Sequence, residues 1–80
     1  MMKQELISNA GGAWEVLDRA GNNLLLRRVK DGEYAIAHGW RGEGKGWDQG
    51  KYFGTDEESA GRKARIVFEG YKLPGSYGYR

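Results

Sequence analysis

The hydrophobic pattern of this chain changes period once, at Thr55, and that change limits the folds open to it. From residue 4 to residue 53, short apolar stretches are broken by turn residues without a sustained helical period, which is typical of a β-meander. After Thr55, apolar residues recur at the spacing of one helical stripe, namely Ala60, Ala64, Val67, Phe68 and Tyr71. The sequence therefore predicts an α+β fold: an antiparallel meander of four to five strands with one C-terminal α-helix packed on one face.

The size and composition of the chain favour one domain. It has 80 residues, of which 39% are hydrophobic and 30% charged, as in an ordinary globular protein. There is no cysteine, so neither disulfides nor thiolate metal sites can reinforce the core. We predict a single domain over residues 1–72, with residues 73–80 as a loosely ordered tail. Since no apolar run resembles a signal sequence or a membrane span, we expect a cytoplasmic protein with no membrane partner.

Two segments are expected to form the first strands of the meander. Glu5-Leu6-Ile7 reads as a short strand, although a helical turn stopped by the following glycines is the alternative. Residues 13–19 read as the second strand, with Trp14 and Val16 on one side.

Asp31-Gly32 is the strongest hairpin signal, because both central positions of a type I′ turn need positive φ. A two-residue loop would pair Val29 with Tyr34 and Arg27 with Ile36. One face would then carry Leu25, Arg27, Val29, Tyr34, Ile36 and His38, and the other Leu24, Leu26, Arg28, Ala35, Ala37 and Gly39. Small residues on the second face would let a helix approach closely, so we predict the core there, although the first face is nearly as apolar.

The segment before the helix should contain a loop and the last strand. Residues 40–46 are too rich in glycine for a strand and are expected to form a mobile hairpin loop. Although glycine-rich, this loop leads into a strand, whereas phosphate-binding loops lead into a helix. Residues 47–53 should form the last strand, with Gly50 at a bulge or a place of close packing.

The start and end of the helix also have sequence signals. Thr55 and Glu58 have the spacing of a capping box, in which the Thr55 hydroxyl accepts the Glu58 amide. Gly61 should cost about 1 kcal/mol relative to alanine. Gly70 is the expected stop, with Pro74 shortly beyond it.

No catalytic or metal-binding arrangement is visible in the sequence. The one histidine, His38, would need Ser8, Ser59 or Ser76 brought to it by the fold to activate a nucleophile, and we expect it instead on the outer face of the sheet. One histidine with scattered carboxylates matches no metal-ligand spacing. We therefore predict a protein that is not an enzyme and uses no cofactor or metal.

Basic residues interleave with aromatic residues around the glycine-rich loop. The candidate partner-binding residues are Trp40, Arg41, Lys45, Trp47, Lys51 and Tyr52. Aromatic rings between cations can stack single-stranded bases, but Trp, Tyr and Arg also anchor protein interfaces. The net charge of +2 is too small to make nucleic acid the default partner. We predict a protein-binding module, with a small single-stranded nucleic-acid-binding domain as the alternative.

Residues 33–60 resemble part of a wider group of proteins. The stretches EYAIAHGW, WDQGKYF and TDEESA, with the glycine loop between the first two, resemble small proteins of phages and mobile elements that have three or four strands followed by a helix. By analogy with anti-CRISPR proteins, the resemblance implies an inhibitor or adaptor that acts on host defence machinery. Its partner would be a host protein or protein–nucleic acid complex. The resemblance implies no catalytic residue, and the sequence does not indicate an oligomeric state.

Overall fold

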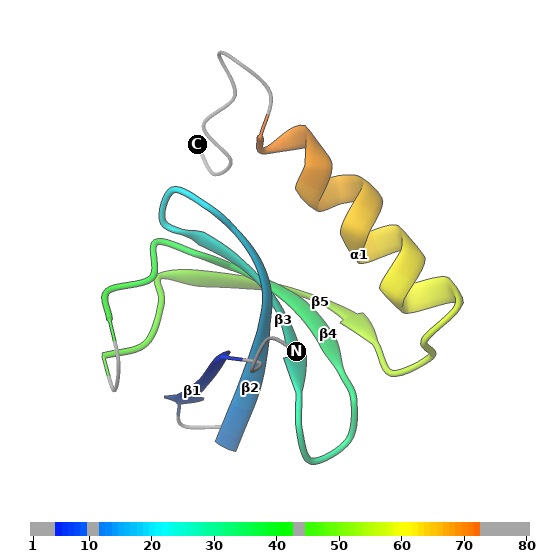
Figure 1. Ribbon diagram of the computed structural model, residues 1–80, viewed down its shortest axis with the longest axis horizontal. Helices are drawn as coiled ribbons and strands as arrows, with labels where there is room; N and C mark the ends of the chain where they lie inside the picture. The colour runs from blue at the N-terminus through cyan, green and yellow to red at the C-terminus, as the bar shows by residue number, and fades with distance from the viewer. Residues whose placement is uncertain (1–4, 10–11, 43–44, 73–80) are drawn as a thin grey trace.

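The computed structural model describes residues 5–9, 12–42 and 45–72 and contains five strands followed by one helix (Figure 1). They are β1 (Glu5–Asn9), β2 (Gly12–Ala20), β3 (Asn23–Arg28), β4 (Tyr34–His38), β5 (Gln49–Gly54) and α1 (Ser59–Gly70). Each strand pairs antiparallel with the next, in the order β1-β2-β3-β4-β5. The predicted α+β fold is confirmed, as is the strand interpretation of residues 5–7. The predicted tail over residues 73–80 lies outside the described residues.

The sheet is strongly curled. Trp14 on β2 and Tyr52 on β5 have ring centroids 6.3 Å apart, although β3 and β4 lie between their strands. In a flat sheet, strands that far apart in the order would be separated by about 14 Å. Two bulges help to bend the strands: the β2–β3 register shifts at Leu17, and the β4–β5 register shifts at Phe53. Figure 1 shows the resulting concave sheet, with α1 on its outer side.

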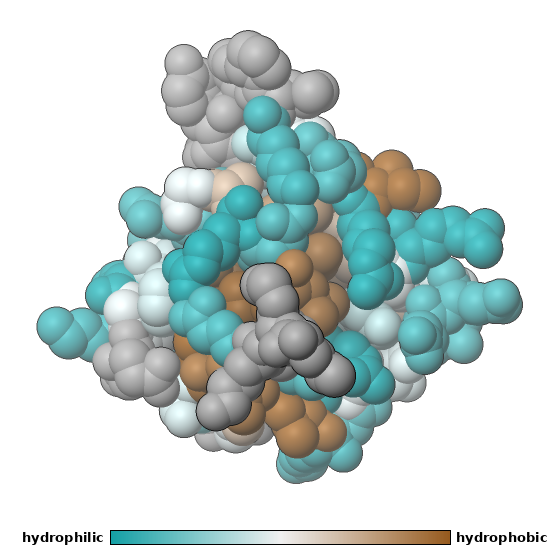
Figure 2. All heavy atoms as spheres, viewed as in Figure 1, coloured by the Kyte–Doolittle hydropathy of each residue, from teal (hydrophilic) through white to brown (hydrophobic). Residues whose placement is uncertain are grey.

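The curl divides the core into two clusters, one on each face of the sheet. We call the cluster on the concave face the inner cluster; it contains Ile7, Trp14, Val16, Leu24, Leu26, Ala35 and Ala37, with Trp40 and Trp47 packed against it. We call the other the helix-side cluster; it contains Leu25, Tyr34, Ile36, Ala60, Ala64 and Phe68. Figure 2 shows hydrophobic side chains gathered in the centre of the view, with hydrophilic side chains around them.

The predicted β3–β4 hairpin exists, but its predicted register is wrong. Arg27 pairs with Tyr34, and Leu25 pairs with Ile36, which is a shift of two residues from a two-residue loop. The loop has four residues, because the Arg28 amide donates to the Glu33 carbonyl at 2.8 Å and the Gly32 amide donates to the Arg28 carbonyl at 2.7 Å. Only Gly32 has positive φ in this loop, so the type I′ turn is also wrong. An even shift leaves the paired side chains of β3 and β4 on their predicted faces, whereas Val29 lies in the loop.

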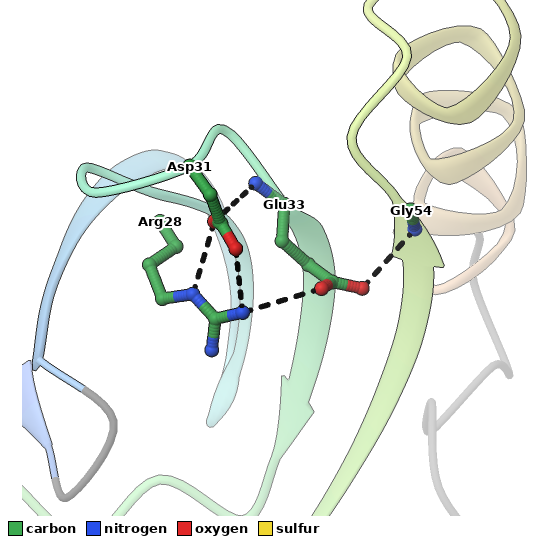
Figure 3. A network of polar contacts seen from close by, with 4 residues as sticks. All are labelled: Arg28, Asp31, Glu33 and Gly54. Carbon is green, nitrogen blue, oxygen red and sulfur yellow. Dashed lines mark hydrogen bonds and ion pairs between the residues drawn. The ribbon is translucent and has the colours of Figure 1, made fainter.

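A polar network at this hairpin explains the longer loop (Figure 3). The guanidinium group of Arg28 donates to both carboxylate oxygens of Asp31, at 3.0 and 2.9 Å, and to Glu33 at 3.3 Å. The other oxygen of Glu33 accepts the backbone amide of Gly54 on β5 at 3.2 Å. The Arg28 hydrogen bonds lower the pKa of Asp31 from 3.8 to about 2. The four-residue loop thus positions Asp31 and Glu33 around one arginine, and Glu33 ties the loop to β5.

The helix packs on the opposite face from the one predicted. Its buried stripe is the expected one, since Ala60, Ala64 and Phe68 are buried and Val67 and Tyr71 pack against them. The stripe, however, covers the face of Tyr34 and Ile36, not that of Ala35 and Ala37. The small residues that allow close approach belong to the helix: an added Cβ on Gly61 would lie 2.9 Å from Cζ of Tyr34. The Tyr34 ring fills the space that Gly61 leaves open.

The helix begins later than predicted and has a different cap. The backbone amide of Ser59 donates to Oδ2 of Asp56 at 2.8 Å, and the Ser59 hydroxyl donates to the same atom at 2.5 Å. These bonds lower the pKa of Asp56. The cap is therefore Asp56 with Ser59, and the predicted Thr55–Glu58 capping box is wrong. The predicted helix end at Gly70 is confirmed.

The last strand is also displaced from its predicted range. It runs over Gln49–Gly54 instead of 47–53, and its bulge lies at Phe53, not at Gly50. Close packing at Gly50 is confirmed, because an added Cβ there would lie 2.7 Å from the Tyr52 hydroxyl. In the predicted loop, of which residues 43–44 lie outside the described residues, the Arg41 amide donates to the Gly46 carbonyl at 3.0 Å.

Candidate functional site

The aromatic residues beside the β4–β5 loop differ in how deeply they are buried. Trp47 is partly buried and meets Trp14 edge to face, with ring centroids 5.7 Å apart. Trp14, at 1% exposure, is fully part of the core. Among the described aromatic residues only Tyr52 is classed as exposed, at 53%, yet its ring leans on Trp14 and lies over Gly50. Tyr52 is therefore an accessible ring held in one place by its neighbours.

Trp40 lies at a different point from Tyr52. Its backbone amide donates to the carbonyl of Asn22 at 3.0 Å, which fixes the end of β4 to the β2–β3 turn. The Arg19 guanidinium stacks over the Trp40 ring, 5.3 Å from the centroid. Because Trp40 also packs against the inner cluster, its ring is partly committed to the fold.

The three predicted cations do not act together. Arg41 forms an ion pair with Asp48, which offsets its charge. Lys51 pairs in register with Ile36, whereas Tyr52 pairs with Ala35, so Lys51 projects from the opposite face to Tyr52. Lys45 alone remains beside the loop with no ion-pair partner among the described residues.

Arg28 belongs to the aromatic site but was not predicted there. Its guanidinium lies over the Trp14 ring, 5.0 Å from the centroid, and is held in place by Asp31 and Glu33. The hydrogen bonds to Asp31 raise the pKa of Arg28, so it stays charged. The sequence signal was present, because Arg28 stands among apolar residues on the face that carries Leu24 and Leu26. The indole nitrogen of Trp14 is buried and has no hydrogen-bond partner in the described part of the chain, although a buried indole N–H usually has one.

His38 is buried, which contradicts the outer-face position predicted for it. Its side chain is 4% exposed, its Nδ1 lies 3.0 Å from Oδ1 of Asn23, and its ring meets the edge of Tyr71 at 5.1 Å. Burial, with a smaller contribution from the charge of Lys51, lowers the pKa of His38. These contacts join β3 and β4 to the end of the helix, so His38 supports the fold.

The remaining chemical features are few. Over residues 5–9, 12–42 and 45–72, no three or more His, Asp or Glu side chains are grouped so that they could hold a metal ion. The one helix of the described chain is too short and too polar to cross a membrane. No protein family, no curated protein and no solved structure matches this chain. Function is therefore inferred from the surface around Tyr52.

Proposed function

We propose that the protein is a non-enzymatic binding module that docks a partner protein on the surface around Tyr52. The single observation that supports this is the state of the Tyr52 ring, which is 53% exposed while every other described aromatic ring is buried or partly buried. Contact with Trp14 and Gly50 holds the ring, so little side-chain entropy is lost on binding. Pre-organised tyrosines of this kind often dominate the energy of protein interfaces.

The surroundings of Tyr52 suit a protein more than a nucleic acid. Trp47 and Tyr52 each contact the ring of Trp14, and Trp40 packs against the same inner cluster. Of the predicted cations, Arg41 is already paired with Asp48 and Lys51 projects from the other face. Arg28, which lies over the Trp14 ring, is paired with Asp31 and Glu33. Of the described cations around the rings and the loop, Lys45 is therefore the one without an ion pair, whereas single-strand binding needs a groove of positive charge along the backbone. The arrangement is closer to one aromatic anchor with a charged rim.

The biological setting that we propose is a phage or mobile-element inhibitor or adaptor that acts on host defence machinery. This setting depends on the sequence resemblance over residues 33–60 and on no structural observation. The protein-docking surface is independent of it.

Photo-crosslinking tests the proposed surface even while the partner is unidentified. A photoreactive phenylalanine analogue at position 52 should capture a discrete partner in cells. The same analogue at position 6 is the matched control, because Leu6 is 56% exposed and lies on the other edge strand. Capture of the same proteins at both positions would refute the proposal. A labelled single-stranded oligonucleotide that binds with a steep dependence on salt would favour the nucleic-acid alternative instead.

A further inference from the structure

The outer edge of β5 is open along most of its length. β5 stands last in the strand order, so β4 flanks it on one side and no described strand flanks it on the other. Its first four residues, Gln49, Gly50, Lys51 and Tyr52, are all exposed. Within the described chain, these four residues have no backbone hydrogen bonds besides their pairing with β4. We call them the open edge.

The open edge leaves backbone groups unpaired. In an antiparallel sheet, the N–H and C=O groups of successive residues point alternately to the two sides of a strand. On the open edge, every second residue therefore directs both groups away from β4, where water or another chain can bind them. At Phe53 the β4–β5 register shifts, and the amide of Gly54 beyond it donates to Glu33 (Figure 3). The unpaired stretch thus ends where the bulge begins.

Two side chains of the open edge are available to a partner, on opposite faces of the sheet. Tyr52 lies on the concave face, with its ring 53% exposed. Lys51 lies on the outer face and forms no ion pair with any described residue. A partner that touches only the concave face leaves Lys51 unused. A strand placed beside the open edge contacts both side chains, because its own side chains also alternate between the faces.

We propose that the partner protein supplies an extended segment that adds to the open edge as a sixth strand. The proposal rests on the function proposed above and specifies how the partner is held. The main chain of the segment pairs with the outward N–H and C=O groups of the open edge, as in other cases of strand addition. Its side chains alternate, with an acidic residue beside Lys51 and an apolar residue beside Tyr52.

The open edge selects an extended protein segment over other occupants. A nucleic-acid strand has phosphates for Lys51 but lacks the alternating N–H and C=O groups that pair with the main chain of β5. A helix uses these groups for its own hydrogen bonds. A second copy of β5 has the required main chain, but its sequence QGKYFG contains no acidic residue for Lys51. Lysine on an edge strand is also a common protection against the pairing of identical edges.

Photo-crosslinking from both faces of β5 tests for the added strand. A photoreactive phenylalanine analogue is placed at position 51 and, separately, at position 52, and the crosslinked residues of the captured protein are mapped by mass spectrometry. The two positions are neighbours in the chain but point to opposite faces. A strand at the open edge should be captured from both, at sites within about three residues of each other. A partner that covers only the concave face should be captured from position 52 alone.

Charge reversal tests the proposed acidic residue of the segment. Lys51→Glu should raise the dissociation constant of the captured protein about tenfold, because like charges then lie side by side. Lys63→Glu is the matched control, since it makes the same change of charge at an exposed position on α1 and should bind like wild type. Circular dichroism checks that both variants are folded.

Residue-resolved hydrogen exchange tests the main-chain pairing. In the free protein, every second amide of the open edge should exchange fast, because it points away from β4. In the complex with the captured protein, the same amides should exchange at least about tenfold more slowly, because each is then hydrogen-bonded.

The outcomes separate this proposal from the proposed function. Capture of a partner from position 52 but not from position 51 would keep the Tyr52 surface and overturn strand addition. Crosslinks from position 51 to a second copy of the chain, or amides of the open edge that exchange equally fast in the complex, would also overturn it. The absence of any specific partner at position 52 would overturn both proposals.

Discussion

Replacing Gly61 with alanine tests the packing of α1 against β4. Helix propensity alone predicts that the change stabilises the protein by about 1 kcal/mol. In the structure, the added Cβ would lie 2.9 Å from Cζ and 3.2 Å from Cε1 of Tyr34. The Tyr34 ring is buried between the helix and the sheet, so it can move only by disturbing its neighbours. Overpacking of this kind costs about 1–3 kcal/mol, and we expect a net destabilisation of about 1 kcal/mol.

The measurement is urea denaturation, supported by thermal unfolding. A loss of about 1 kcal/mol corresponds to a fall in Tm of about 4–8 °C for a domain of this size. Gly70→Ala is the matched control, since Gly70 is also helical and an added Cβ there meets no atom within 4 Å. It should stabilise the protein by up to about 1 kcal/mol. If both variants gain stability equally, the close contact between Gly61 and Tyr34 is refuted.

Three further predictions concern the core, the helix cap and pH. Phe68→Ala should lower the free energy of unfolding by about 3–5 kcal/mol, because the ring is almost fully buried in the helix-side cluster; a nearly neutral result in chemical denaturation would contradict this packing. Asp56→Ala should lower the free energy of unfolding by about 1 kcal/mol in the same assay, while Thr55→Ala should change it by less than about 0.5 kcal/mol. A larger loss in Thr55→Ala than in Asp56→Ala would support the Thr55–Glu58 capping box instead. Because burial lowers the pKa of His38 in the folded state, the unfolded chain takes up the proton first as the pH falls below about 6.5, so stability should decline from there downward. His38→Asn should flatten that decline, and wild-type stability that is constant between about pH 7 and pH 5 would count against the buried histidine.

The order of elements could be predicted from sequence because its signals are local. Alternating Trp14 and Val16, the turn at Asp31-Gly32 and the stripe from Ala60 to Phe68 each depend on neighbouring residues only. The register of the β3–β4 hairpin could not be obtained this way. It depends on Arg28 binding Asp31 and Glu33 together, which the Asp-Gly pair does not indicate.

The face covered by the helix was predicted wrongly because the small residues that permit close packing were expected on the sheet, whereas the structure has them on the helix. Ala35 and Ala37 suggested that the helix packs on their face of the sheet. In the structure the space comes from Gly61 on the helix, and the large ring of Tyr34 packs against it. Because both faces of the sheet are apolar, the face that the helix covers is decided by this fit between Gly61 and Tyr34, which are distant in the sequence.

The candidate site could be predicted from the sequence only in part, because it also depends on contacts between distant residues. The sequence indicated that aromatic residues surround the loop. Which ring is accessible depends on the curl of the sheet, which brings Trp14 on β2 against Tyr52 on β5. Lys51 was misplaced because consecutive residues of a strand point to opposite faces, and Lys51 and Tyr52 are neighbours within the predicted strand over residues 47–53.

The role of Tyr52 is decided by the affinity of the captured partner for the wild type and for Tyr52→Ala, with the free energy of unfolding measured on the same samples. We predict that binding weakens by more than about 2 kcal/mol, roughly thirtyfold, while stability changes by less than about 1 kcal/mol. Trp47→Ala, which removes a ring packed against the inner cluster, should instead lower stability by about 2 kcal/mol or more. Unchanged affinity in Tyr52→Ala, or a loss of stability as large as that of Trp47→Ala, would contradict the assignment of Tyr52 as the anchor of a binding surface.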